Sequence, residues 1–177
     1  KLVIVTTVPI TIKSILKNQP KFLDRSFDVC IITSSGKEID DIERNEGVKT
    51  YTVEMQRAIS PLKDLISVFK LFILFLKIRP DIVHSYTPKA GLLSMLASSF
   101  AFVRIRIHTF TGLIFPSRRG FTKLILIYMD RLTIFLSSCV IAESEGVKDE
   151  LESIKAPLTK IKKIGYGNIS GVDEQLF

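Results

Sequence analysis

The chain has 177 residues, of which 46% are hydrophobic, so it is long enough to bury the core of one ordinary domain. Its net charge of +7 at pH 7 either favours anionic partners such as phosphorylated metabolites or acidic lipids, or serves solubility alone. Nucleic acid is excluded as the favoured partner, because the chain has no Trp, no alternation of arginine with aromatic residues and no helix-turn-helix or zinc-finger pattern.

Short β-branched runs alternate along the chain with longer segments of helical period. We expect strands at 1–7, 27–33, 48–55, 81–86, 104–110, 139–144 and 160–166, and helices near 10–24, 38–45, 62–79, 88–102, 120–137 and 144–154. Pro20 would kink or break the first helix, and Pro61 would begin the third. This alternation predicts an α/β fold, a Rossmann-like, doubly wound, mainly parallel sheet of about seven strands with helices on both faces.

The chain divides into a predicted domain and a tail. Residues 1–166 carry all the expected strands and helices. The stretch 167–177, "GNISGVDEQLF", shows neither a helical nor a strand period. We therefore expect it to be a linker that leaves the domain toward a second one.

The helix expected at 62–79 explains much of the chain's high mean hydropathy. Its apolar residues follow helical spacing, at Leu62, Leu65, Ile66, Phe69, Phe72, Ile73 and Leu76. Lys63, Lys70 and Lys77 line the opposite side. The pattern fits either a core helix with a solvated lysine edge or a surface helix that rests on a membrane. The longest apolar run, 71–76, is far too short to span a bilayer.

A polar cluster follows the fourth expected strand, in "HSYTPKAG" (84–91). In an open α/β sheet, ligands bind beyond the carboxyl ends of the strands where strand order reverses, here between the first and fourth strands. Thr87 is a candidate N-cap and Pro88 a first helical residue, so the positive helix end would face this crevice beside Lys89. The pattern predicts a phosphate or diphosphate site, and its alternative is a plain helix cap beside a solvated lysine.

The fifth expected strand ends in a similar way, with "HTFTGLIFPSRRG". Gly112 would let a ligand approach the backbone closely. Arg118 and Arg119 would either clamp an anionic acceptor or remain solvated. His84 and His108 are candidates for polar ligand contacts or for buried core residues.

Several motifs are missing from the sequence. No GxGxxG follows the first strand, and the chain has no P-loop, no GxSxG and no spaced His/Cys/Asp metal set. Its two cysteines are far apart and form neither a metal site nor a disulfide framework. We therefore expect no metal and no cofactor, and find no complete catalytic set in the sequence.

Four segments resemble one known family. They are "VTTVPITIKSILKNQPKFL", "ISPLKDLISVFKLFILFLKIRPDIVHSYTPKAGLLSMLA", "IHTFTGLIFPSRRG" and "GNISGVDEQLF". Together they are similar to the N-terminal, acceptor-side domain of the GT-B-fold, family 4 retaining glycosyltransferases. Within that family the resemblance is to bacterial enzymes of surface-polysaccharide and lipid-linked-oligosaccharide biosynthesis.

The resemblance implies a function. Such enzymes have two Rossmann-like domains across a cleft, and the nucleotide-sugar, here a UDP-sugar, binds mostly to the C-terminal domain that this chain lacks. The N-terminal domain binds an acceptor, commonly a polyprenyl-diphosphate-linked glycan, and often has a membrane-facing surface. We expect a retaining hexosyltransferase, cytoplasmic and peripheral at the inner face of the bacterial plasma membrane, whose 177-residue part is inactive alone.

The resemblance also suggests site residues. Lys89, Arg118 and Arg119 would contact the acceptor phosphates, and His84 or His108 would contact a sugar. The cleft would be lined by Thr7, Pro9, Thr87, Thr111 and Gly112. Many relatives have a histidine where this chain has Tyr86 and another where it has Thr111, so the role of His108 in transfer stays open.

Two other functions fit parts of the sequence. The chain could be a non-catalytic, membrane-recruiting subunit of a two-chain glycosyltransferase. A sugar-nucleotide epimerase of the same fold is a further candidate, but it would need acid/base carboxylates that the loops named above do not offer.

Overall fold

A seven-stranded, wholly parallel sheet organises the computed structural model, which describes residues 1–165 and 169. The strands are β1 (Leu2–Val5), β2 (Val29–Thr33), β3 (Lys49–Thr52), β4 (Ile82–Ser85), β5 (Ile105–Phe110), β6 (Cys139–Ala142) and β7 (Ile161–Lys163). The helices are α1 (Ile10–Ser14), α2 (Gln19–Asp24), α3 (Ile39–Glu46), α4 (Pro61–Ile78), α5 (Pro88–Phe100), α6 (Gly120–Leu136) and α7 (Glu145–Ser153), with 3-10 turns η1 (Phe115–Ser117) and η2 (Leu158–Lys160). The predicted fold class is confirmed.

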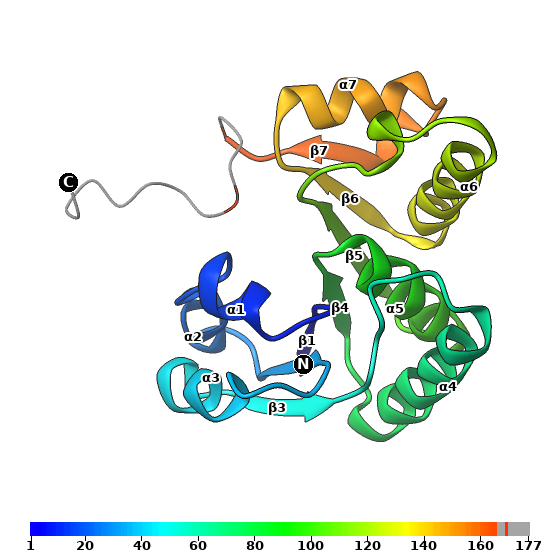
Figure 1. Cartoon of the computed structure of the whole chain (residues 1–177). Coiled ribbons are helices and arrows are strands. Elements are labelled where there is room, and N and C mark those ends of the chain that lie inside the picture. The colour runs from blue at the N-terminus through cyan, green and yellow to red at the C-terminus, as the bar shows by residue number, and fades with distance from the viewer. Residues whose placement is uncertain (166–168, 170–177) are drawn as a thin grey trace.

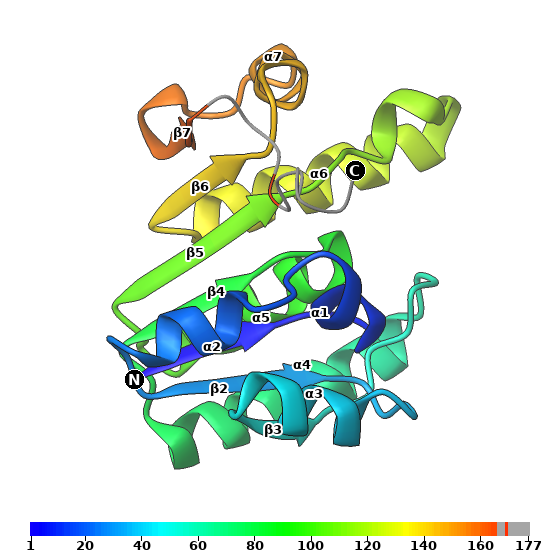
Figure 2. The ribbon, with the colours of Figure 1, turned by 90° about the vertical axis from the view of Figure 1, so that its left-hand side faces the viewer.

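The helices form two layers around the sheet. Figures 1 and 2 show α1, α2, α3 and α7 on one face and α4, α5 and α6 on the other. The strand order is β3-β2-β1-β4-β5-β6-β7, so the order reverses between β1 and β4 as predicted. Val5 pairs with Ser85 at the carboxyl ends of these two strands, which brings the loops that follow them together.

The predicted first helix is two helices. α1 ends at Ser14, and α2 begins at Gln19 after Asn18, which adopts a left-handed conformation with φ 65°. The Glu46 carboxylate accepts hydrogen bonds from the amides of Asn18 and Lys21, which holds the break in place. Pro20 thus lies in the first turn of α2, in line with the predicted break.

The expected linker 167–177 lies outside the described residues, except for position 169.

α4 packs on the core, as one of the two interpretations expected, but largely through a different face from the one predicted. Its buried face consists of Ser67, Leu71 and Phe75. The predicted apolar face points outward instead: Leu62 and Phe69 are 79% and 63% exposed. The error has a physical cause, since α4 is apolar nearly all round and its period alone does not say which face packs on the sheet. Among the described residues, no helix has the length and apolar character needed to cross a membrane.

A glycine lets α5 lie close to β5. Gly91 is buried in α5, and a Cβ added there would lie 2.4 Å from Cε1 of His108. His108 lies in β5, where it is fully buried and cannot move aside into solvent. The close packing of this helix on the sheet therefore depends on the missing side chain at position 91.

We predict that Gly91→Ala lowers the free energy of unfolding by about 1–3 kcal/mol, because the added methyl overpacks the contact with His108. Urea unfolding of the 177-residue chain measures this change. Gly146→Ala in α7 is the matched control: nothing lies within 4 Å of its added Cβ, so stability should stay the same or rise slightly. Equal effects of the two substitutions would contradict the account.

Candidate functional site

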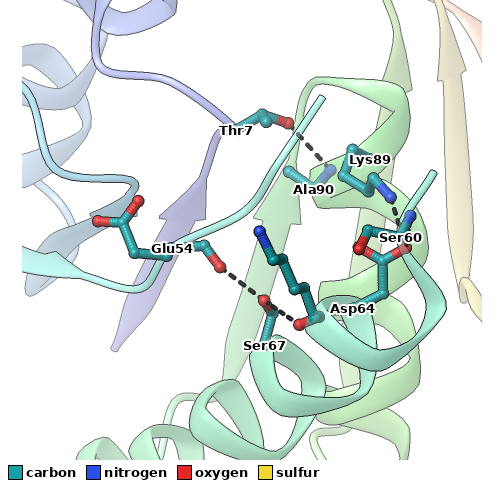
Figure 3. A network of polar contacts seen from close by, with 8 residues as sticks. Thr7, Glu54, Ser60, Asp64, Ser67, Lys89 and Ala90 are labelled. Atoms are coloured by element: carbon teal, nitrogen blue, oxygen red, sulfur yellow. Dashed lines mark hydrogen bonds and ion pairs between the residues drawn. The ribbon is translucent and has the colours of Figure 1, made fainter. Parts of the chain in front are cut away.

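Two threonines join the loops that follow β1 and β4. The Thr7 amide donates to Thr87 Oγ1 over 3.0 Å, and the two hydroxyl oxygens lie 2.6 Å apart. The Ala90 amide in turn donates to Thr7 Oγ1 over 3.2 Å (Figure 3). Thr87 is the N-cap residue as predicted, but its hydroxyl makes no capping bond within its own helix. Thr7 supplies that bond from the neighbouring loop.

The start of α5 offers fewer free amides than predicted. Pro88 has no N–H group, Ala90 donates to Thr7, and Gly91 donates to the Thr87 carbonyl. Anion recognition at this helix end therefore depends mainly on the side chain of Lys89.

Lys89 forms a buried ion pair with Asp64 of α4. Its Nζ lies 2.6 Å from Asp64 Oδ2, and the two side chains are only 7% and 16% exposed. The Ser60 amide also donates to Asp64 Oδ2, over 3.2 Å (Figure 3). Within residues 1–165 and 169, Asp64 Oδ1 has no hydrogen-bond partner. The ion pair holds the lysine in place, which contradicts the alternative of a solvated Lys89.

A neighbouring contact fixes α4 itself. The Ser67 hydroxyl donates to the carbonyl of Glu54, over 2.6 Å, and lies 2.8 Å from that of Lys63. Glu54 follows β3, so this bond ties the segment between β3 and α4 to the helix that carries Asp64 (Figure 3).

A small pocket of about 60 Å³ lies beside Lys89. Its polar or flexible lining comes from four segments: Arg57 before α4, Lys89 in α5, Gly112 after β5 and Asp130 in α6. The apolar part of the lining consists of Ile59, Pro88, Leu113, Ile114, Leu126 and Met129. The structure thus brings Lys89 and Gly112 together, and Gly112 has φ 143°, a conformation that a side chain would strain.

Three polar residues of this site were not found from the sequence. Arg57 stands in a loop with no motif around it, and Asp64 was not singled out within the α4 segment. Asp130 was not singled out either. Its signal was its position, a single acid inside the apolar run "LILIYMDRLTIFL".

Asp130 has an unusual protonation equilibrium. Burial disfavours its charged form and raises the pKa of its carboxyl to about 7. The group therefore exchanges a proton near neutral pH and can either donate or accept a hydrogen bond in the pocket.

The other loop residues predicted for the site lie outside the pocket beside Lys89. Arg118 and Arg119 are exposed between η1 and α6 and do not line the pocket beside Lys89. Thr111 is half-buried and is also outside its lining. Pro9 is buried and packs against Gly36, where an added Cβ would lie 2.6 Å from its Cγ.

His84 belongs to a second pocket, of about 190 Å³, on the α2 side of the sheet. Its Nε2 lies 2.8 Å from Thr109 Oγ1, and its Nδ1 lies 3.1 Å from the Tyr86 hydroxyl, which donates to Gln19 Oε1. Burial lowers the pKa of His84 to about 3 and raises that of the Tyr86 hydroxyl, so both are neutral at pH 7. The predicted sugar-contacting histidine is thus separate from Lys89.

His108 lies in the core rather than in either pocket. It is fully buried, and its Nδ1 lies 2.8 Å from Ser85 Oγ. Its Nε2 has no partner in the described part of the chain. Burial, with a smaller contribution from His84, lowers the pKa of His108 to about 3. In this conformation the candidate catalytic histidine has packing contacts and no access to a ligand.

A parallel sheet with a polar pocket beyond the carboxyl ends of β4 and β5 is typical of a Rossmann-like domain. The chain belongs to the glycosyl transferase 4-like domain family, whose model matches residues 21–167.

Two curated relatives are similar in sequence. The chain is 33% identical over 165 residues to the capsular polysaccharide biosynthesis glycosyltransferase CapM of Staphylococcus aureus, a match that covers 92% of this chain and 43% of CapM. It is 30% identical over 118 residues to the UDP-Gal:alpha-D-GlcNAc-diphosphoundecaprenol alpha-1,3-galactosyltransferase of Escherichia coli, covering 66% of this chain and 30% of that enzyme. The chain thus spans less than half the length of either relative.

A solved structure has the same fold. Anabaena Alr3699/HepE, crystallised in complex with UDP, superposes with a TM-score of 0.73 at 17% sequence identity. The match covers 99% of this chain and 45% of that protein. At this identity the similarity establishes the fold alone.

We predict that His108 makes the folded state lose stability in acid. Its pKa is about 3 in the folded protein and near 6.5 when unfolded, so protons bind preferentially to the unfolded chain as the pH falls below about 6.5. As the pH falls from 6.5 to 5, protonation of His108 in the unfolded chain should lower the free energy of unfolding by about 2 kcal/mol. Urea unfolding at a series of pH values measures the loss.

His108→Asn is the matched variant, because an amide can still bond to Ser85 but does not titrate. Asp130 has a raised pKa and shifts stability in the opposite direction as the pH falls from about 7, but this contribution is common to both proteins and cancels in the comparison. Parallel stability profiles of wild type and variant would show that His108 does not have this lowered pKa.

Proposed function

We propose that the chain is the acceptor-binding domain of a retaining glycosyltransferase of bacterial polysaccharide biosynthesis. In this proposal the enzyme transfers a hexose from a UDP-sugar to a polyprenyl-diphosphate-linked glycan. Family membership, the names of the two curated relatives and the fold shared with a UDP complex support it. The observation that carries it is Lys89, held at the start of α5 beside a pocket that residues following β4 and β5 help to line.

Lys89 suits a diphosphate despite its ion pair. An ammonium has three N–H donors, and Asp64 Oδ2 takes one of them. Arg57 adds a second cation to the same pocket. With the diphosphate in this pocket, the glycan would extend from it into the cleft between the two domains.

The donor side would belong to another domain. Retaining transfer passes through an oxocarbenium-like state, in which the enzyme positions the acceptor hydroxyl and stabilises the leaving diphosphate. The proposal needs no metal and no cofactor, because the nucleotide-sugar is a substrate. It also implies that the 177 residues alone transfer no sugar. A membrane-recruiting subunit of a two-chain enzyme would share this fold. Sugar transfer by the full-length protein without a second chain distinguishes the enzyme from such a subunit.

The enzyme would work at the inner face of the plasma membrane. The outward face of α4 combines exposed apolar residues such as Leu62, Leu65 and Phe69 with the exposed lysines Lys63 and Lys70. Apolar side chains can enter the headgroup region while the lysines bind anionic lipids. This peripheral attachment would bring the domain to a lipid-linked acceptor, with no role for nucleic acid.

We predict that Lys89→Met, in the full-length enzyme, lowers kcat/KM for a polyprenyl-diphosphate-linked acceptor by roughly 10- to 100-fold, because a charge-assisted contact to phosphate is lost. The KM for the UDP-sugar should change little. Radiolabelled sugar transfer measures both, and Lys17→Met, an exposed lysine of the α1–α2 connection, is the control.

Lys89→Met alone leaves Asp64 without its counter-charge, so Asp64→Leu/Lys89→Met is tested beside it. A folding artefact would be repaired in the double variant, whereas loss of a phosphate contact would not. Unchanged acceptor kinetics in Lys89→Met would contradict the proposed site. An enzyme that transfers no sugar to any lipid-linked acceptor, before mutation, would contradict the proposed function.

We also predict that the chain binds vesicles containing anionic phosphatidylglycerol and that rising salt weakens this binding. Phe69→Ser in α4 should reduce binding by about 10-fold, because one apolar anchor is lost. Phe22→Ser is the matched control, since Phe22 is 65% exposed compared with 63% for Phe69 but lies on α2 at the other face of the sheet. Equal loss in both variants, or binding that is insensitive to salt, would contradict attachment through α4.

A further inference from the structure

An apolar groove of about 420 Å³ runs between α5 and α6. Its walls are Leu92 and Leu96 of α5 and Phe121, Leu124, Ile125, Tyr128, Met129 and Leu132 of α6. None of these side chains is charged, and Phe121, Tyr128 and Leu124 are exposed by 77%, 67% and 53%. Apolar surface of this kind, arranged as a groove, fits a long and flexible apolar ligand better than a sugar.

The groove begins where the Lys89 pocket ends. Met129 lines both of them. On α5, Pro88 lines the pocket while Leu92 and Leu96 line the groove, and a spacing of four residues places all three along one side of that helix. The site therefore has a polar end, with the cations Lys89 and Arg57 and the acid Asp130, and an uncharged apolar extension.

This arrangement matches an amphiphile with an anionic head and an apolar tail. We propose that the groove between α5 and α6 holds the first isoprene units of a polyprenyl diphosphate whose phosphates lie at Lys89. The inference rests on the proposed function and adds a site for the lipid part of the acceptor. Lys89 and Arg57 lie at one end of the groove only, which favours an amphiphile with an anionic head over an uncharged partner surface.

The test is the binding of two soluble probes to the 177-residue chain, by calorimetry in buffer without vesicles. Inorganic diphosphate probes the head site alone, and farnesyl diphosphate adds three isoprene units. Farnesyl diphosphate should bind about 10- to 100-fold more tightly, because part of its tail leaves water. Equal affinity for the two probes, or no measurable binding of farnesyl diphosphate, would overturn the inference.

Matched variants show which surface accounts for the tighter binding of farnesyl diphosphate. Leu124→Gln/Leu132→Gln in the groove should remove most of the farnesyl advantage and leave inorganic diphosphate binding unchanged within about twofold. Leu65→Gln/Leu76→Gln, two exposed leucines of α4 outside the groove, should change neither affinity. Equal losses in both double variants would overturn the inference by showing general adhesion to apolar surface.

Two further results would identify a different occupant of the groove or a different head site. Dissociation of a dimer in the groove variant, seen by analytical ultracentrifugation, would show that a second copy of the chain covers the groove and would overturn the inference. Farnesyl diphosphate binding that depends on the groove but not on Lys89, tested with Asp64→Leu/Lys89→Met, would support the groove while contradicting the head site of the proposed function.

Discussion

The ion pair between Lys89 and Asp64 is the contact on which the site depends. A lysine that is only 7% exposed loses most of its hydration, and a carboxylate at 2.6 Å offsets that cost. The pair also removes the freedom of a long side chain, so that its ammonium is fixed beside the pocket before any ligand arrives. A cation held in this way is suited to recognising phosphate at a defined position rather than to general attraction of anions.

The surrounding fold is built to hold this pair. Asp64 comes from α4, which the Ser67 bond to Glu54 ties to the segment after β3. Lys89 comes from α5, whose first turn is bound to the loop after β1 through Thr7. The reversal of strand order between β1 and β4 is what places these segments together. Gly91, by allowing α5 to contact the ring of His108, sets the depth of the helix on the sheet.

Two helices on this side of the sheet, α4 and α6, present apolar side chains to solvent. α4 packs through Leu71 and Phe75 and leaves Leu62 and Phe69 in solvent. α6 likewise leaves Phe121 and Tyr128 exposed beside the groove. Exposed apolar surface of this extent marks a place where a protein, a lipid or a ligand binds, and it is the observation behind the proposed membrane attachment.

The sequence predicted the sheet well and the site only partly. Continuous β-branched runs and strict alternation of strands and helices constrain the topology strongly. The switch-point rule singled out Lys89 and the polar end of the fifth strand singled out Gly112, and the structure places both beside one pocket. The partners of Lys89 were missed because ion pairs such as that with Asp64 join residues distant in sequence and leave no local pattern. The outward face of α4 was misjudged because periodicity does not say which side of an almost wholly apolar helix is buried. His84 and His108 were grouped as candidates, yet alternation along neighbouring parallel strands places them on opposite faces of the sheet.

The most direct test of the central claim is a crystal structure of the full-length protein with a short-chain polyprenyl diphosphate bound. We expect a phosphate oxygen within hydrogen-bonding distance of Lys89 Nζ, with the bond from Lys89 to Asp64 retained. Phosphate bound instead at Arg118 and Arg119, or in the pocket that contains His84, would contradict it.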